Sequence, residues 1–398
     1  MNSGITMGTL LSLYEDFPQY IDTINLNIPE SGNTIPDLLD ETLHNLRWMM
    51  TMQDEDGGVY HKLTTAEFEG AVKPEEAVNQ RWVVQKGTAA TLDFAAVTAQ
   101  ASRIFQEYQK ELPGLADSLL VMSKKAYTWA KENPEVAYIQ KNLKELTINT
   151  GAYGDGKFAD EFQWAAIELF VTTGDEKFYK DSDIEKDAVE AFGIPSWPNV
   201  NTLALYTLVR NRNKLKTNSI VNISSIESKV IEMAEELVEH SKESAYATPM
   251  GDKSSNFVWG SNSVAGNQGV LLINAYLLTG DEKYLNAANH NLDYLLGRNA
   301  TGFSFLTGFG KKSTKDPHHR PSESDDQEDP VPGLLAYGPN PGQQDKAYCE
   351  GKYTDAHKYP ATSYIDDRCS YASNEIAINW NAPFAYLANG IEALRNKK

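Results

Sequence analysis

The chain has 398 residues, of which 41% are hydrophobic and 10% aromatic, and its formal net charge at pH 7 is −19. Such an acidic chain argues against nucleic acid or an anionic membrane as a partner, because both attract basic surfaces. An uncharged or insoluble substrate stays compatible with this charge. The longest apolar run is far too short to span a membrane, and the length allows two domains or one large helical ring.

Helical periodicity runs along most of the chain. Apolar spacing predicts eleven helices, over 5–14, 36–52, 88–108, 115–131, 162–172, 176–191, 199–213, 224–241, 264–278, 283–296 and 374–396. Ser224 and Glu227 have the spacing of a capping box, which would begin the helix over 224–241. No run of alternating apolar and polar residues predicts strands, so the expected fold class is all-α.

Two segments, 164–178 and 271–284, repeat one pattern of an apolar helix, a Thr-Gly-Asp turn and a second helix. In each turn the glycine can adopt the left-handed conformation that ends the first helix, and the aspartate can cap the second. Repeated helix pairs indicate an α-solenoid or a closed ring of hairpins. Such a ring carries its site in loops at one end, and segment 300–373 is too long to be a simple connector.

The only two cysteines, Cys349 and Cys369, lie in this long C-terminal segment. Two cysteines cannot form a structural zinc site by themselves. They either form a disulfide, which would indicate an oxidising compartment, or remain two free thiols.

Polar residues gather in two clusters toward the C-terminus. His318, His319 and Arg320 are consecutive, while Asp366 and Glu375 lie in the loop leading into the last predicted helix, with Glu375 expected near its first turn. A glutamate at such a position can simply be a surface residue favoured by the helix dipole. Together, the two clusters predict a polar, open cleft.

The residues from Ser304 to Arg320 and from Tyr364 to Pro383 resemble the two C-terminal signatures of glycoside hydrolase family 9, the cellulase family with an (α/α)6 barrel. Segments 88–96, 259–262, 294–299 and 338–340 also match the family pattern. The resemblance covers essentially the whole chain, so it implies a single catalytic domain over residues 1–398, an (α/α)6 toroid of helical hairpins.

The family hydrolyses β-1,4-glucans with inversion, which needs two carboxyl groups roughly 6.5–9.5 Å apart on opposite sides of the sugar. By resemblance Glu375 is the general acid, with a pKa raised by partial burial or by nearby carboxylates such as Asp366. Asp366 would balance the charge and hold the sugar. His318 and Arg320 match positions that contact the glucan near the cleavage point, so the implied catalytic set is Glu375, Asp366 and His318.

Five further residues are candidates for substrate binding: His319, Trp197, Trp259, Tyr364 and Trp380. Tryptophan and tyrosine rings can stack on sugars, but the same rings also fill hydrophobic cores. For the tryptophans the choice between a sugar contact and packing stays open at this point.

One family feature is missing. The catalytic base lies in an Asp-Ala-Gly-Asp motif just upstream of an Asn-Ser-Gly helix start, yet here the tripeptide at 2–4 follows Met1 and the motif occurs nowhere in the chain. A closed ring also needs twelve helices rather than eleven. We therefore expect an N-terminally truncated member that lacks its first helix and base loop, with weak or no activity. The alternatives are a non-catalytic β-glucan-binding protein and an exo-acting β-glucosidase or glucosaminidase of the same family.

The resemblance implies no required cofactor, although a structural calcium ion is an expectation. Relatives bind calcium with an Asp-Glu pair that looks like Asp160 and Glu161, but Asn199 stands where they add a further acidic residue. Capping of the following helix is the other interpretation of this pair. The implied partner is a β-glucan polysaccharide or oligosaccharide and the implied location is extracellular or periplasmic, although no signal peptide is visible in the chain.

Overall fold

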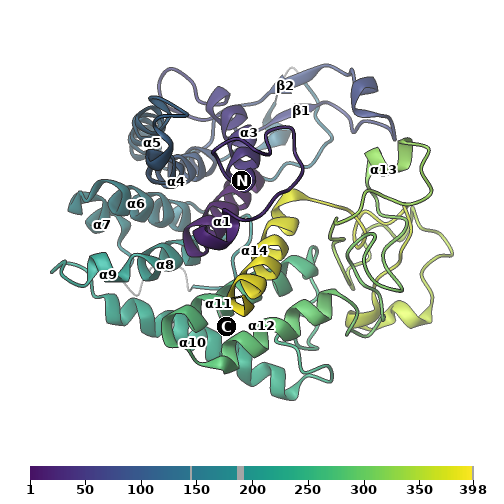
Figure 1. The fold of residues 1–398 in the computed structure, drawn as a ribbon. Coiled ribbons are helices and arrows are strands. Elements are labelled where there is room, and N and C mark those ends of the chain that lie inside the picture. Colours follow the sequence, from purple (N-terminus) through teal and green to yellow (C-terminus); the bar gives the residue numbers. More distant parts are fainter. Residues whose placement is uncertain (144–145, 186–191, 397–398) are drawn as a thin grey trace. The chain divides into compact units, whose positions relative to one another are not determined.

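The computed structural model describes residues 1–143, 146–185 and 192–396 and is mostly helical (Figure 1). Its chain forms two compact units. The first unit comprises Met1–Phe68 and Asn79–Glu227, and the second comprises Glu69–Val78 and Ser228–Lys398. Helix α10 (Ile223–Glu243) begins in the first unit and continues in the second. The single domain expected from the family resemblance stays a prediction.

The first unit is built around α4, which packs against α1, α5 and α6 (Figure 1). Helix α4 is rich in alanine and other small residues and is buried on nearly all sides. Its small side chains let the neighbouring helices approach closely. The helices of this unit are α1 (Asn2–Asp16), α2 (Pro18–Ile21), α3 (Asp37–Thr51), α4 (Thr88–Phe105), α5 (Leu115–Glu132), α6 (Ala159–Thr173), α7 (Glu176–Ser182), α8 (Asn201–Arg210) and α9 (Arg212–Leu215), with 3₁₀ turns at Gln106–Tyr108 and Gln140–Asn142.

The first unit also contains a short antiparallel hairpin that the sequence did not predict. Strand β1 (Leu63–Thr65) pairs with β2 (Arg81–Val83), with Thr64 opposite Trp82. Strands of three residues are too short to show a period of two, so the expectation of no strands is wrong here. The middle of the segment that joins the strands, Glu69–Val78, belongs to the second unit and carries the 3₁₀ turn Pro74–Glu76.

In the second unit α14 packs against α11 and α12 (Figure 1). Leu387 and Ile391 of α14 are almost fully buried and anchor this helix in the core. The helices here are α11 (Ser261–Thr279), α12 (Glu282–Leu295), α13 (Arg320–Ser324) and α14 (Ile378–Arg395), with 3₁₀ turns at Asp355–Lys358 and Pro360–Thr362. The rest of segment 300–373 is mainly loop.

The two repeated turns adopt the predicted geometry. Gly174 and Gly280 have φ angles of 72° and 69°, so each ends its helix in the left-handed region that glycine favours. The Asp175 side chain accepts a hydrogen bond from the Lys177 N–H at 3.0 Å, and Asp281 makes the equivalent bond at 3.0 Å. The α6–α7 and α11–α12 pairs thus use the same stop and start signals, as predicted.

Two helix ends differ from the prediction. Helix α10 begins at Ile223, and the Asn222 side chain accepts a hydrogen bond from the Ser225 N–H at 3.2 Å. The predicted capping box of Ser224 and Glu227 is therefore wrong, because a better cap lies two residues earlier. The helix predicted over 176–191 ends earlier, at Ser182, and its predicted residues 186–191 lie outside the described residues.

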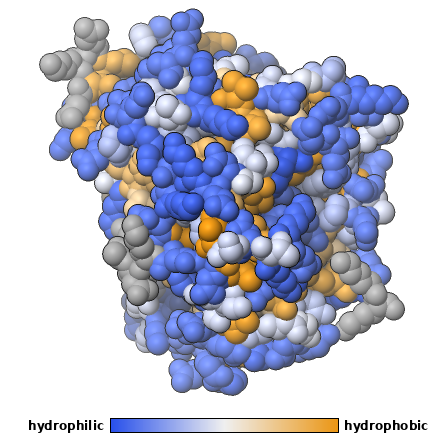
Figure 2. Space-filling model, turned by 90° about the vertical axis from the view of Figure 1, so that its left-hand side faces the viewer, coloured by the Kyte–Doolittle hydropathy of each residue, from blue (hydrophilic) through white to orange (hydrophobic). Residues whose placement is uncertain are grey.

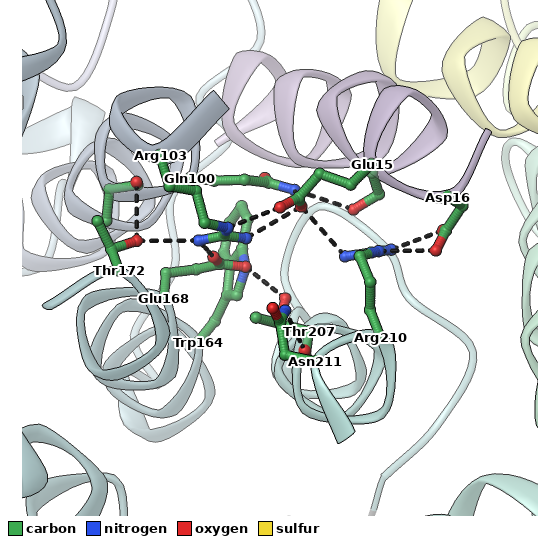
Figure 3. Close-up of polar contacts among 12 residues, drawn as sticks. Glu15, Asp16, Gln100, Arg103, Trp164, Glu168, Thr172, Thr207, Arg210 and Asn211 are labelled. Carbon is green, nitrogen blue, oxygen red and sulfur yellow. Dashed lines mark hydrogen bonds and ion pairs between the residues drawn. The ribbon is translucent and has the colours of Figure 1, made fainter. Parts of the chain in front are cut away.

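A buried ion-pair network joins α1, α4, α6 and α8 in the first unit (Figure 3). Arg103 donates to Glu15 and to Glu168, in each case at 2.6 Å. Arg210 pairs with Asp16 at 2.8 Å and with Glu15 at 3.4 Å. Burial alone would raise the pKa of Glu15, but the two arginines outweigh it and hold this pKa below its usual value.

The face shown in Figure 2 is covered mainly by hydrophilic residues, with small separate hydrophobic patches between them. This pattern agrees with the charge of −19. Within the described parts of the chain, no helix is both long enough and apolar enough to cross a membrane.

Candidate active site

Glu375 lies in a short extended segment that immediately precedes α14. Its backbone forms a parallel bridge with His318, and the next residue, Ile376, forms an antiparallel bridge with Ala336. The His318 N–H donates to the Asn374 carbonyl at 2.9 Å. These bridges hold the backbone extended, so the helix predicted from residue 374 begins only at Ile378, and Glu375 lies just before its first turn.

The Glu375 carboxyl group is half-buried, and burial raises its pKa. The Tyr337 hydroxyl hydrogen-bonds this carboxyl group, and the Tyr337 N–H donates to the Glu375 carbonyl at 3.1 Å. The charges acting on it are those of His318 and Arg320, and both lower the pKa. Burial raises this pKa, as predicted. Asp366, which was expected to raise it further, is not among the groups that act on it, and the charged neighbours lower it instead.

Both carboxylate oxygens of Asp366 are engaged with the protein. They accept hydrogen bonds from the Lys315 N–H at 2.8 Å, the Asp316 N–H at 3.0 Å and the Asn374 side-chain amide at 3.1 Å. Asp366 therefore joins the segment before His318 to the segment before Glu375 and helps to set their register. Its direct contact with a sugar stays a prediction.

His318 is fixed by its own ring nitrogen. Nδ1 lies 2.6 Å from the Arg368 carbonyl, so Nδ1 carries the hydrogen and donates. The same nitrogen lies 4.0 Å from the Glu323 carboxylate, and the ring centroid lies 6.3 Å from that of Tyr371. The ring is thereby oriented beside Glu375, consistent with the predicted place near the reacting bond.

His319 and Arg320 stand at the start of α13, and both have protein partners. His319 Nδ1 lies 2.9 Å from the Ser322 hydroxyl, and burial lowers the pKa of this histidine. Arg320 donates from Nε to the Glu69 carbonyl at 2.7 Å, within the second unit. The predicted sugar contacts of this pair stay predictions.

Trp259 and Tyr371 present aromatic rings in the same unit. Trp259 is 41% exposed, and its ring centroid lies 5.9 Å from that of Tyr371, with 32° between the ring planes. The two rings are tilted by 32° to each other, and the exposed face of Trp259 suits stacking on the C–H face of a sugar ring. This exposure agrees with the sugar-binding interpretation of Trp259.

Trp380 is half-buried and Tyr364 is buried, and for Trp380 the choice between packing and a sugar contact stays open. The Trp380 ring contacts Tyr337 edge-on and lies over Gly260, where a Cβ atom would stand 2.8 Å from the indole. Tyr364 is 3% exposed, and its hydroxyl bonds Thr314 and Asn374, each at 2.7 Å. The structure contradicts the predicted sugar contact of Tyr364, because the ring is enclosed by the core.

Three of the predicted residues lie in the first unit. Trp197 is half-buried and meets the Tyr153 ring edge-on at 6.0 Å between centroids. Asp160 and Glu161 are fully buried in the first turn of α6, and Asp160 accepts from the Val200 N–H at 2.8 Å. Neither side chain caps α6, so the capping interpretation is wrong.

The Asp160–Glu161 pair supplies carboxylate oxygens of the kind that bind calcium, but it is only two residues. One Asp160 oxygen and both Glu161 oxygens are buried without a hydrogen-bond donor, and such oxygens are the ligands that Ca²⁺ prefers. Burial raises the pKa of both groups, and the neighbouring carboxylates raise that of Glu161 further. Among the described residues no group of three or more His, Cys, Asp or Glu could hold a metal. Calcium therefore stays a prediction.

Cys349 and Cys369 form a disulfide, with 5.3 Å between their Cα atoms. Of the two alternatives that the sequence left open, the structure contains the disulfide. It closes the loop directly upstream of the segment that carries Tyr371 and Glu375.

Sequence reasoning missed two residues of this region. Tyr337 contacts Glu375 directly. Its position just before segment 338–340, which matches the family pattern, was a usable signal. Asp345 is fully buried and organises the disulfide loop through three hydrogen bonds to its carboxylate. Nothing in its local sequence distinguishes it from a surface aspartate.

Comparison with known proteins identifies the family. The model of glycosyl hydrolase family 9 matches residues 1–388. A xyloglucan-specific endo-beta-1,4-glucanase of Bacteroides ovatus is 47% identical over 99% of this chain and 67% of its own length. An Endoglucanase D of Acetivibrio thermocellus is 32% identical over 98% of this chain and 58% of its own length. This chain thus spans about three fifths to two thirds of these relatives.

Solved structures agree. A family 9 protein of Bacteroides ovatus superposes with a TM-score of 0.91 at 44% identity, covering 99% of this chain and 70% of that one. A structure titled as AaCel9A in complex with cellobiose-like isofagomine superposes with a TM-score of 0.86 at 27% identity, covering 100% of this chain and 72% of that one. These matches confirm the predicted all-α (α/α)6 fold class and the grouping with glycoside hydrolases of the endoglucanase type. The chain belongs to glycosyl hydrolase family 9.

Proposed function

We propose that the chain hydrolyses β-1,4-glucosidic bonds of a glucan, with Glu375 as the general acid. The observation that carries this proposal is the environment of Glu375: a half-buried carboxyl group with a raised pKa, bonded by Tyr337 and flanked by His318 and Arg320. A general acid must hold its proton near the working pH and release it in the transition state. Membership of a glycoside hydrolase family supports the assignment.

The surroundings of Glu375 suit both halves of this step. Burial favours the protonated form before reaction, because it penalises the charged carboxylate. As the proton moves to the leaving oxygen, the carboxylate that forms is stabilised by the Tyr337 hydroxyl and by the charges of His318 and Arg320. The leaving sugar thus departs as a neutral alcohol.

Inversion also needs a second carboxyl group, which activates water, and the family motif that carries it does not occur in this sequence. No Asp-Ala-Gly-Asp sequence occurs in it, and Asp366 is already engaged by three donors. A positioned base contributes about 10²–10⁴-fold to the rate. We therefore expect this chain alone to hydrolyse glucan weakly, and by inversion once a base is present.

We propose xyloglucan as the substrate, with cellulose as the second candidate. The relative described as xyloglucan-specific is 47% identical, against 32% for Endoglucanase D. Both substrates share a β-1,4-linked glucan backbone, so the same acid can serve either one. We also propose an extracellular or periplasmic location, which the Cys349–Cys369 disulfide supports.

The test is reducing-sugar release from xyloglucan, carboxymethyl cellulose and barley glucan. Three proteins are compared: this chain, the same chain fused to an upstream segment carrying the Asp-Ala-Gly-Asp motif, and the fused chain with Glu375→Gln. We expect cleavage to rise about 10²–10⁴-fold in the fusion and to be abolished by the glutamine change. Tight glucan binding without cleavage in either form would favour the binding protein, and release of single sugars from the outset would favour exo action.

A further inference from the structure

Directly before the disulfide loop of the second unit stands an aromatic residue, Tyr348, that the proposed catalytic centre does not use. Tyr348 is 75% exposed, and its ring centroid lies 5.6 Å from that of Tyr371, with 69° between the planes. Tyr371 in turn lies 5.9 Å from Trp259. These three rings, the Trp259–Tyr371–Tyr348 cluster, form an aromatic surface with Tyr371 in its middle.

This cluster begins beside the proposed catalytic residues. The Tyr371 ring centroid lies 6.3 Å from that of His318, whose charge acts on Glu375. The Tyr348 ring neighbours Tyr371 as well, turned by 69° relative to it. Tyr371 is thus a ring that His318 and Tyr348 both neighbour.

A buried carboxylate fixes the backbone beneath Tyr348. Asp345 is fully buried and accepts from the Tyr353 hydroxyl at 2.6 Å, the Ser370 hydroxyl at 2.6 Å and the Ala372 N–H at 2.8 Å. Its carbonyl accepts the Tyr348 N–H at 2.8 Å. The backbone that carries Tyr348 is thus bonded through one residue to the segment on either side of Tyr371.

The disulfide adds a covalent link between the same two segments. Cys349 directly follows Tyr348, and Cys369 stands two residues before Tyr371. The Tyr371 hydroxyl also donates to the Gln344 carbonyl at 3.1 Å, on the Tyr348 side of the loop. An exposed ring on a backbone held this firmly loses little freedom when a ligand covers it, and such preorganisation favours binding.

We infer that Tyr348 forms an additional sugar-binding position, in which a pyranose ring of the glucan chain stacks beyond the Trp259–Tyr371 pair. This inference rests on the proposed function and extends it, because it makes the affinity depend on chain length. A tyrosine ring offers an apolar face to the C–H side of the sugar and a hydroxyl to its rim. The position binds an uncharged saccharide, which is compatible with the acidic chain.

The experiment measures binding of cellotriose, cellohexaose and a xyloglucan oligosaccharide by isothermal titration calorimetry, in a Glu375→Gln background that stops hydrolysis. Tyr348→Ala is compared with Tyr348→Phe, which keeps the ring. The matched control is Tyr359→Ala; Tyr359 lies within the disulfide loop and is 60% exposed, and the Lys358 ammonium lies over its ring.

We expect Tyr348→Ala to weaken binding of the longer oligosaccharides roughly three- to tenfold, the range of an aromatic contact. Cellotriose binding should change by less than about twofold, and Tyr348→Phe and Tyr359→Ala should bind like the parent. Unchanged affinity of Tyr348→Ala for every saccharide would overturn this inference while leaving the proposed function standing. A parent protein that binds none of the saccharides would instead overturn the proposed function, and this inference with it.

Discussion

The buried ion-pair network of the first unit gives a sharp prediction for stability. Glu168 is fully buried and pairs with Arg103 at 2.6 Å, while Glu15 approaches the same arginine at 2.6 Å (Figure 3). Replacing Arg103 with methionine keeps much of the apolar stem but leaves Glu168 without a cation. Thr207 and Trp164 still donate to it, at 2.5 Å and 3.2 Å, but neither carries a charge.

Breaking a buried pair by removing one partner costs about 3–5 kcal/mol, because an uncompensated charge remains buried. We therefore expect Arg103→Met to lower the free energy of unfolding by about this amount. Adding Glu168→Gln removes the unpaired buried charge. The double variant should therefore lose about 1–3 kcal/mol less unfolding free energy than the two single variants lose together.

The assay is urea unfolding followed by tryptophan fluorescence and circular dichroism on the parent, both single variants and the double variant. The matched control is Lys131→Met, which breaks the exposed Lys131–Asp181 pair at 3.4 Å and should cost about 0–1 kcal/mol. A loss below about 1 kcal/mol for Arg103→Met, with additive effects in the double variant, would show that Arg103 does not compensate a buried charge on Glu168.

Three further predictions follow from the same structure. The arginines hold the folded-state pKa of Glu15 below its unfolded value of about 4.3. The stability that Glu15 contributes is therefore present above that pH and is lost as the pH falls through the folded-state pKa. Between pH 6 and pH 3 the urea midpoint should fall less in Glu15→Gln than in the parent. Tyr337→Phe removes a hydrogen bond that favours the Glu375 carboxylate, so the alkaline limb of kcat/KM should move to higher pH; an unmoved or lowered limb would show that the bond does not act on the acid. If Asp160 and Glu161 bind Ca²⁺, millimolar calcium should raise the melting temperature of the parent over that in chelator, and a Glu161→Gln variant should lose the response; equal temperatures for the parent would leave calcium without support.

Local signals in the sequence predicted local structure well. The Thr-Gly-Asp turns end and begin their helices as predicted, because the glycine conformation and the aspartate cap involve only neighbouring residues. The family signatures led to the loops that carry His318 and Glu375. The backbones of these two residues do pair in the structure.

The failures at the candidate site involve contacts between residues far apart in sequence. Glu375 stays outside α14 because its backbone pairs with His318, a partner that helix periodicity does not reveal. Tyr364 has the residue type of a sugar-binding residue, but Phe303 and Phe305 enclose its ring. Asp345 acts through residues up to 27 positions away. Such partners become visible only when the chain is folded.

Substrates with different leaving groups test whether Glu375 protonates the leaving oxygen. A dinitrophenol leaves as a stable anion and needs no proton, whereas a sugar alcohol does. In the chain fused to the motif-bearing segment, Glu375→Gln should abolish xyloglucan cleavage, by about 10²–10⁴-fold, and largely preserve the rate on dinitrophenyl β-cellobioside. Equal losses on both substrates, or no loss on xyloglucan, would contradict the assignment of Glu375 as the general acid.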